Sequence, residues 1–213
     1  MDNKTFGIGY MPLRVNFVAM NNAFEQVKAT IKQRRTAKLA AMNGNTIPDE
    51  QVKELLELAH WAPTHGRTEP WNFFVYTGEA LKQFGKDHAD LHWGITPEEK
   101  RLEATYEKLK HNGDNASHLI IAVMKRGTNE KIPQLEEIAA ASAAVQNILL
   151  GATAMGIASF WSTGGLTHKP ELKEYLKLGP DDIILGLIYL GYTDEAVAEG
   201  MRKTTSAEKG FWM

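Results

Sequence analysis

The sequence predicts a single mixed domain of α-helices and β-strands. Segments with apolar residues at helical spacing alternate with short apolar or aromatic runs typical of strands, without internal repeats or a linker. The chain has 213 residues, 43% of them hydrophobic, which is enough for one sizeable core. We expect residues 22–213 to form this domain and residues 1–21, which show no period, to form an N-terminal arm.

The individual elements follow from local patterns in chain order. A helix is predicted where apolar residues recur every three or four positions, as Phe24, Val27 and Ile31 do. A strand is predicted where apolar, aromatic or β-branched residues run together up to a polar or glycine turn. The expected elements are a helix at 22–34, a helix from 46–49 to 62–63, a strand at 71–76, helical structure over 79–112, a strand at 119–124, a helix at 136–155, a strand at 157–161, a short helix at 171–176, a strand at 183–190 and a polar, irregular tail.

Two of the helices carry further information. Thr46 offers a cap hydroxyl, Pro48 suits a first turn, and Asp49 places negative charge at the positive end of the helix dipole. The helix over 136–155 is rich in alanine and apolar nearly all round, so we expect it to be buried centrally. Together with the arm and the tail, this helix suggests a subunit interface that exchanges segments.

Composition excludes several classes of protein. The chain has no cysteine, which excludes disulfide scaffolds, thiolate metal sites and thiol nucleophiles. Its formal charge of −2 does not indicate a broad basic surface that would bind nucleic acid. No run is long and apolar enough to span a membrane, and no signal-peptide pattern begins the chain, so we expect a cytoplasmic protein. The Gly151–Gly156 segment has P-loop glycine spacing but lacks the Lys-Ser/Thr pair that follows it in a P-loop.

Three separated clusters remain as candidate binding sites. Arg34-Arg35-Thr36-Ala37-Lys38 offers three cations and a hydroxyl that match phosphate oxygens. The segment from Ala62 to Trp71 is a polar loop between a helix and a strand, and the segment from Trp161 to Thr167 is a glycine turn that a flat ligand can approach. Taken singly, each cluster also fits a plain helix end, loop or turn. His88 and His92 share a helix face, but a solvated face explains them better than a metal site.

In this order and spacing, the clusters resemble the nitroreductase family of FMN enzymes. The resemblance rests on Arg34–Lys38, Ala62-Pro63, Pro70-Trp71-Asn72-Phe73-Phe74, the alanine-rich helix, Trp161-Ser162-Thr163-Gly164 and Leu190-Gly191-Tyr192. It implies an α+β fold, with a mixed, mainly antiparallel sheet flanked by helices, in an intertwined homodimer with FMN at the subunit interface.

The resemblance also implies roles for individual residues. Arg34, Arg35 and Thr36 correspond to residues that grip the FMN phosphate and ribityl chain. Lys38 corresponds to a cation near flavin N1 and O2, where it stabilises the reduced flavin. The other implied cofactor contacts are Trp161, Ser162, Thr163 and Gly164 at the flavin edge and face, Arg202 or Lys203 at the phosphate, and His65 and Glu69 from the second subunit.

Two residues depart from the family pattern. Arg67 stands where an asparagine is common, and Glu69 replaces a glutamine. These departures affect the expected contacts from the second subunit and the charge preference for substrates.

The implied reaction is ping-pong electron transfer. NADH or NADPH would reduce the flavin, and a nitroaromatic, quinone or similar small acceptor would then be reduced at the same face, with no catalytic side chain required. Three alternatives are a flavin-binding sensor without turnover, a member of the same fold that fragments flavin or removes halogen, and a metal protein using His88 and His92.

Overall fold

The computed structural model describes residues 17–213, with side chains described from residue 22 onward. The rest of the expected arm, residues 1–16, lies outside this range. The elements of the described part are α1 (Phe17–Gln33), η1 (Leu39–Ala41), α2 (Asp49–His60), η2 (His65–Arg67), β1 (Trp71–Thr77), α3 (Gly78–Ile95), η3 (Glu98–Lys100), α4 (Glu103–Lys110), β2 (His118–Met124), α5 (Gln134–Ala154), β3 (Ala158–Ser162), α6 (Pro170–Tyr175) and β4 (Ile183–Gly191).

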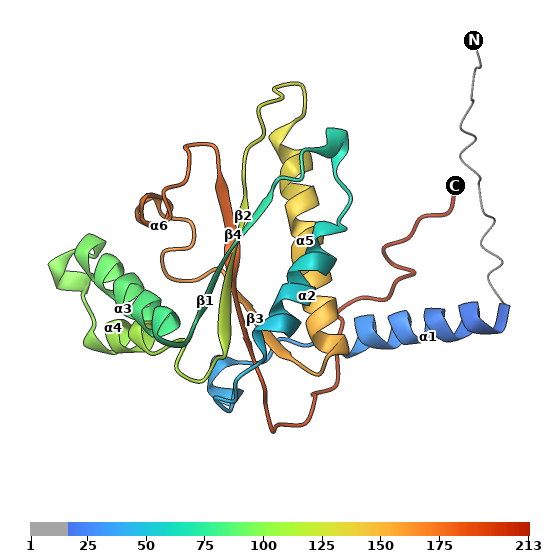
Figure 1. Ribbon diagram of the computed structural model, residues 1–213, viewed down its shortest axis with the longest axis horizontal. Helices are drawn as coiled ribbons and strands as arrows, with labels where there is room; N and C mark the ends of the chain where they lie inside the picture. Colours follow the sequence, from blue (N-terminus) through green and yellow to red (C-terminus); the bar gives the residue numbers. More distant parts are fainter. Residues whose placement is uncertain (1–16) are drawn as a thin grey trace, which may run out of the picture.

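The strands form one sheet in the order β1-β2-β4-β3, and every strand pair is antiparallel. Helices α2 and α5 cover one face, while α3, α4 and α6 lie on the other (Figure 1). The prediction of an α+β fold with an antiparallel sheet flanked by helices is therefore confirmed. Strands β1 and β3 form the two edges of the sheet.

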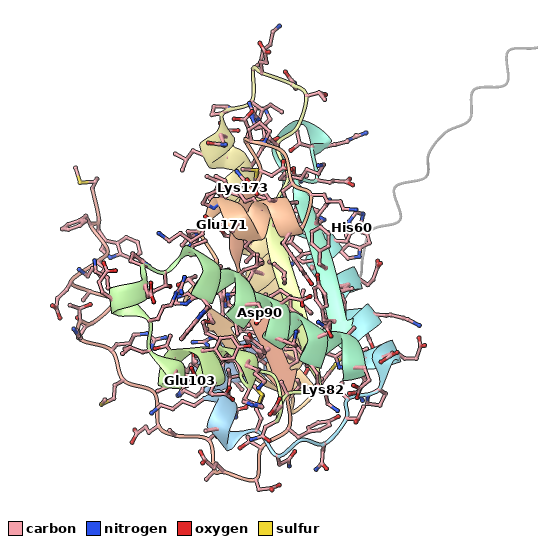
Figure 2. All side chains as sticks on the ribbon, turned by 90° about the vertical axis from the view of Figure 1, so that its left-hand side faces the viewer. His60, Lys82, Asp90, Glu103, Glu171 and Lys173 are labelled. Atoms are coloured by element: carbon pink, nitrogen blue, oxygen red, sulfur yellow. The ribbon has the colours of Figure 1, made fainter. Side chains whose placement is uncertain are left out.

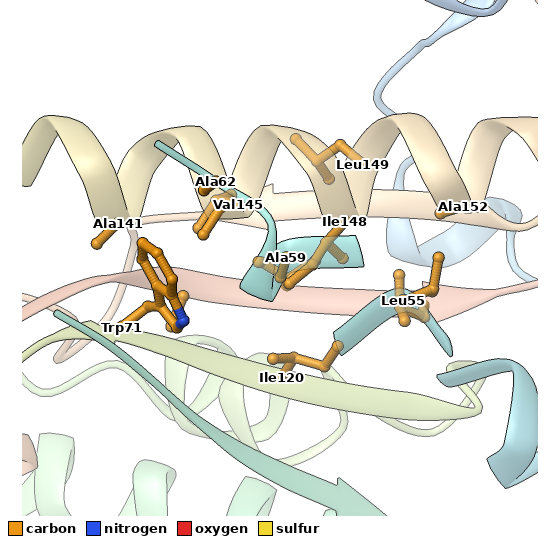
Figure 3. Packing of buried hydrophobic residues seen from close by; sticks show 14 of the residues in the cluster. Leu55, Ala59, Ala62, Trp71, Ile120, Ala141, Val145, Ile148, Leu149 and Ala152 are labelled. Carbon is orange, nitrogen blue, oxygen red and sulfur yellow. The ribbon is translucent and has the colours of Figure 1, made fainter. Parts of the chain in front are cut away.

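Both faces of the sheet are buried, which explains why the central strands are apolar throughout. In β2, Ile120 and Ala122 pack toward α2 and α5, whereas the alternating Leu119 and Ile121 pack toward α3 and α6. Figure 3 shows the core on the α5 side, where α2, α5 and the sheet meet at fully or nearly fully buried side chains. The labelled residues there are Leu55, Ala59, Ala62, Trp71, Ile120, Ala141, Val145, Ile148, Leu149 and Ala152.

Two helix starts differ from the sequence prediction. Helix α1 begins at Phe17 rather than at residue 22, so it takes in the last residues of the expected arm. Helix α2 begins at Asp49, with Pro48 in the N-cap position and no side-chain cap, so Thr46 does not cap it. The neighbouring Ile47 N–H instead donates to the Ser117 hydroxyl at 2.7 Å, which ties this helix start to β2.

The alanine-rich helix α5 is buried on one face, not all round as its composition predicts. Ala141, Ala144 and Ile148 are buried against the sheet and α2, whereas Leu135 is 74% exposed. The reason is that no other element of this chain covers the outer side of the helix in the described residues. Helix α1, which projects beside α5 (Figure 1), likewise exposes Phe24 and Val27. No helix among the described residues is long and apolar enough to cross a membrane.

Candidate functional site

The basic cluster lies directly beside edge strand β3. Thr36 forms a parallel bridge with Ser159, and the Ala37 N–H donates to the Ser159 carbonyl at 2.9 Å. Residues 34–38 therefore extend the sheet by one short segment beyond β3. This pairing brings two of the three clusters together, because Ser159 leads along β3 into Trp161 and the following turn.

A cavity of 410 Å³ opens where the basic cluster meets the tail. Arg34 and Arg202, far apart in sequence, both line this cavity, which we call the arginine cavity. Thr36 and Ser159 add hydroxyl groups, and Trp161 adds an aromatic wall. Its other lining residues, Ile31, Gln146 and Leu149, come from α1 and α5, and no Asp or Glu is among the lining residues. This donor set suits a phosphate group.

Arg35 is turned toward the tail and away from the arginine cavity. Its Nε donates to the Ala198 carbonyl at 2.9 Å, and its Nη1 donates to the carbonyls of Lys32 and Arg34 at 2.6 and 2.8 Å. Gly200 lies against the same guanidinium, since a Cβ there would be 2.2 Å from Nη2. The structure thus places Arg35 as a clamp on the tail segment that leads to Arg202, rather than among the residues lining the cavity.

The glycine turn after β3 has a defined shape. The Gly164 N–H donates to the Ser162 hydroxyl at 3.3 Å, and the Thr167 hydroxyl donates to the Gly164 carbonyl at 2.7 Å. Gly165 has φ +62°, and a Cβ at this position would be 2.6 Å from the His88 ring. Glycine is required here both by the backbone conformation and by the contact with α3. Lys38, Ser162 and Gly164 together border a second, larger cavity on the α3 side of the sheet.

A bulge in β4 positions Trp161. Ala122 pairs with Gly186 and Val123 with Ile184, which leaves Leu185 without a partner in β2. The Trp161 indole N–H donates to the Leu185 carbonyl at 3.0 Å. The indole crosses Gly186 so closely that a Cβ there would be 2.1 Å from its Nε1. The bulge and the glycine therefore fix the aromatic wall of the arginine cavity.

The loop carrying His65 and Glu69 lies at the other end of α5. His65 Nδ1 is 2.5 Å from a carboxylate oxygen of Glu136 in the first turn of α5, whereas Leu149, which lines the arginine cavity, lies near its last turns. Glu136 and Leu149 are thirteen positions apart along the helix, a rise of roughly 20 Å. Within one chain the structure does not bring His65 and Glu69 to the clusters around Arg34. Glu69 has φ +44°, and its side chain lies 3.7 Å from His60 Nε2.

Two further predicted residues, Thr163 and Lys203, are exposed, in the turn and on the tail respectively. Sequence reasoning missed Gln146, although a polar residue within an alanine-rich helix was a usable signal. It also missed Ser159, which lies two residues before Trp161 and so on the same face of β3.

Of the possible metal pair His88 and His92, the first is held inside the protein. His88 is 3% exposed, and burial, with a smaller contribution from His92, lowers its pKa from 6.5 to about 4. Its Nε2 accepts the Leu166 N–H at 3.0 Å. Among residues 22–213, no group of three or more His, Asp or Glu side chains is placed to hold a metal ion.

Comparison with known proteins identifies the family of the chain. The sequence profile described as "Nitroreductase family" matches residues 31–192. YdjA of Escherichia coli (strain K12), provisionally assigned as an NAD(P)H nitroreductase, is 32% identical over 142 residues, which make up 67% of this chain and 75% of YdjA.

Solved structures share the fold. The nitroreductase-like family protein from Bacillus cereus superposes with a TM-score of 0.76 at 28% identity, covering 88% of this chain and 95% of that one. The FMN-dependent nitroreductase NfnB from Mycobacterium smegmatis, solved in complex with NADPH, has a TM-score of 0.66 at 18% identity, covering 90% and 99% of the two chains.

Because the profile covers more than half of its length, the chain belongs to the nitroreductase family. Its relatives are enzymes, and the expectation of an oxidoreductase of the nitroreductase type is confirmed.

Proposed function

We propose that this protein binds FMN and passes electrons from NADH or NADPH to a nitroaromatic, quinone or similar small acceptor by a ping-pong mechanism. The observation that carries this proposal is the arginine cavity, in which Arg34 and Arg202 converge beside Trp161, near the end of β3 that leads into the glycine turn. The proposal is consistent with the FMN and NADPH named for the related structure from Mycobacterium smegmatis.

The residues present fit the FMN phosphate. Arg34, Arg202, Thr36 and Ser159 line one cavity that has no acidic lining residue, so a dianionic group there would meet two arginines and two hydroxyl residues without repulsion from a carboxylate. Arg35 contributes indirectly by holding the tail at Ala198, which keeps Arg202 within reach of Arg34. Lys203 is the alternative tail cation for the same role.

The residues beyond the phosphate would hold the flavin ring. When bound, FMN supplies the chemistry by accepting a hydride from the nicotinamide and returning electrons to the acceptor. Lys38 borders the turn and offers a cation that favours negative charge on the ring. Trp161, Ser162, Thr163 and Gly164 would orient the ring through side-chain and backbone contacts. No side chain is required to act as an acid, a base or a nucleophile.

A homodimer would complete this site. Phe24, Val27 and Ile31 line the exposed side of α1 and are 50–64% exposed, and Leu135 is exposed on α5. Large apolar side chains exposed on neighbouring elements typically mark a protein interface. A second copy packed there would bury them and would bring its own His65 and Glu69 toward the first copy's clusters, which one chain alone does not do.

Steady-state kinetics test the proposed function. NADPH or NADH oxidation is measured with FMN-loaded protein at several fixed concentrations of a nitroaromatic acceptor. A ping-pong enzyme gives parallel double-reciprocal lines. Bound flavin without acceptor-dependent turnover would refute the proposal and favour a flavin-binding sensor. Failure to bind FMN would refute both.

A further inference from the structure

A second cavity, of 730 Å³, lies between edge strand β3 and the α3–α4 pair, and we call it the α4 cavity. Figure 2 shows the α3 and α4 side of the molecule, with Asp90 and Glu103 labelled on these helices. The floor of the cavity is apolar, because Phe160, Leu187 and Tyr189 point from β3 and β4 toward α3. A cavity of this size with an apolar floor falls in the range of small-molecule sites.

The rim of the α4 cavity is cationic. Lys38 and Lys108 both line it, and Asn112 adds an amide group. The residues of the described chain that line it include no Asp or Glu, although the whole chain carries 26 acids against 24 Lys and Arg. Neither Lys38 nor Lys108 forms an ion pair within residues 22–213, whereas the next lysine on α4, Lys110, pairs with Glu107. An anion in the cavity would meet these two cations and no lining carboxylate, although His111, which also lines it, contacts Glu107 and Asp114.

The buried ring of His88 adds no charge to the α4 cavity. The ring is neutral near pH 7, and its Nε2 accepts the Leu166 N–H at 3.0 Å, so the ring proton resides on Nδ1. Nδ1 is buried and has no hydrogen-bond partner among the described protein atoms. Because Nδ1 is shielded from solvent while the cavity is open to it, a ligand in the cavity does not contact this atom. His88 is one of the residues lining the α4 cavity.

The α4 cavity also adjoins the proposed flavin site. Lys38, Ser162 and Gly164, which we assign to the flavin ring, lie on its border. A planar ligand on the apolar floor would thus lie next to the ring, with its charged end toward α4. We infer that the α4 cavity binds an aromatic carboxylate, held by Lys108 at its charged end. This inference rests on the proposed function for the position of the flavin, and it names aromatic acids as the preferred class of acceptor.

The test compares two probes that differ in charge alone. Benzoate and benzamide have nearly the same shape, and their binding to the FMN-supplemented protein is measured by calorimetric titration. We expect benzoate to bind about tenfold more tightly, as for a hydrogen bond with a charged partner compared with a neutral one. Lys108→Gln removes the cation and should weaken benzoate binding about tenfold, leaving benzamide binding and FMN affinity unchanged.

Lys110→Gln provides the matched control. It makes the same charge change on the same helix at a residue that does not line the α4 cavity, so benzoate binding should not change. Equal binding of the two probes, or equal effects of the two substitutions, would overturn the inference. Weaker FMN binding in Lys108→Gln would also overturn it, because the cavity would then belong to the flavin.

Turnover separates this inference from the proposed function. With NADPH as donor, 4-nitrobenzoate should be preferred to 4-nitrobenzamide in kcat/KM, and Lys108→Gln should remove the preference. Reduction of both acceptors at equal rates would refute the inference and retain the oxidoreductase. Selective benzoate binding without reduction of either acceptor would retain the carboxylate site and refute the proposed function.

Discussion

Replacing Gly200 with valine perturbs the segment that brings Arg202 to the arginine cavity. A Cβ at this position would be 2.2 Å from Nη2 and 2.5 Å from Cζ of Arg35, so the guanidinium must move. The Arg35–Ala198 hydrogen bond of 2.9 Å would then be lost, and with it the only contact we assign to holding this part of the tail. The backbone of Gly200 is not in the left-handed region, so valine itself introduces no conformational strain.

The expected effect is on FMN affinity and not on folding. The Arg35 contact is near the surface, so its loss should cost the fold no more than about 1 kcal/mol. A guanidinium–phosphate hydrogen bond is typically worth about 1.5–3 kcal/mol. Displacing Arg202 from the phosphate should therefore raise the FMN dissociation constant about tenfold or more. Flavin fluorescence titration of the apoprotein measures this constant directly.

A double-substitution cycle makes the prediction specific. Arg35→Ala should weaken FMN binding as much as Gly200→Val does, and the double variant should be no weaker than either one, because both act through the same clamp. Gly210→Val, also on the tail, is the matched control, since a Cβ there meets nothing closer than 3.5 Å. Additive losses, or unchanged affinity in Gly200→Val, would refute the role assigned to Arg35.

Three further perturbations test other parts of the structure. His88 has a folded pKa of about 4, below its ordinary 6.5, so its contribution to stability is complete above pH 6.5 and is lost as pH falls toward 4. The free energy of unfolding, measured with urea, should fall by about 3 kcal/mol over this pH range in the native protein and should not show this fall in His88→Gln. The same pH dependence of unfolding in both proteins would contradict this. Glu137→Ala should destabilise the fold by about 3 kcal/mol, because it leaves Arg126 without its buried partner. A melting temperature within about 2–3 °C of the native value would contradict this role of Glu137. Phe24→Asp should convert a dimer to monomers in sedimentation equilibrium, and an unchanged mass would remove α1 from the proposed interface.

Much of the fold could be predicted from sequence because local patterns match the structure closely. The strand expected at 119–124 is β2 (His118–Met124), and the one expected at 183–190 is β4 (Ile183–Gly191). Their apolar runs are unbroken because both faces of the sheet are covered. Helix boundaries were less predictable, since Thr46 has a cap residue's chemistry while the proline after Ile47 sets the actual start of α2.

The candidate site was predictable only where its residues are consecutive in sequence. Arg34, Thr36 and Trp161 stood out as parts of clusters, and their proximity follows from one bridge between Thr36 and Ser159. The direction of the Arg35 side chain could not be predicted from the sequence. It depends on the position of the tail segment at Ala198, which is far away along the chain. The α4 cavity combines residues from β3, β4, α3 and α4, and no local pattern connects Lys108 to Gly164.

The most direct test of the central claim is the visible absorption spectrum of the purified protein under anaerobic conditions, before and after addition of NADPH or NADH. We expect flavin bands that bleach with one equivalent of reduced nicotinamide, and weaker flavin retention in Arg34→Gln and Arg202→Gln. A protein that neither carries flavin nor takes up added FMN would contradict it.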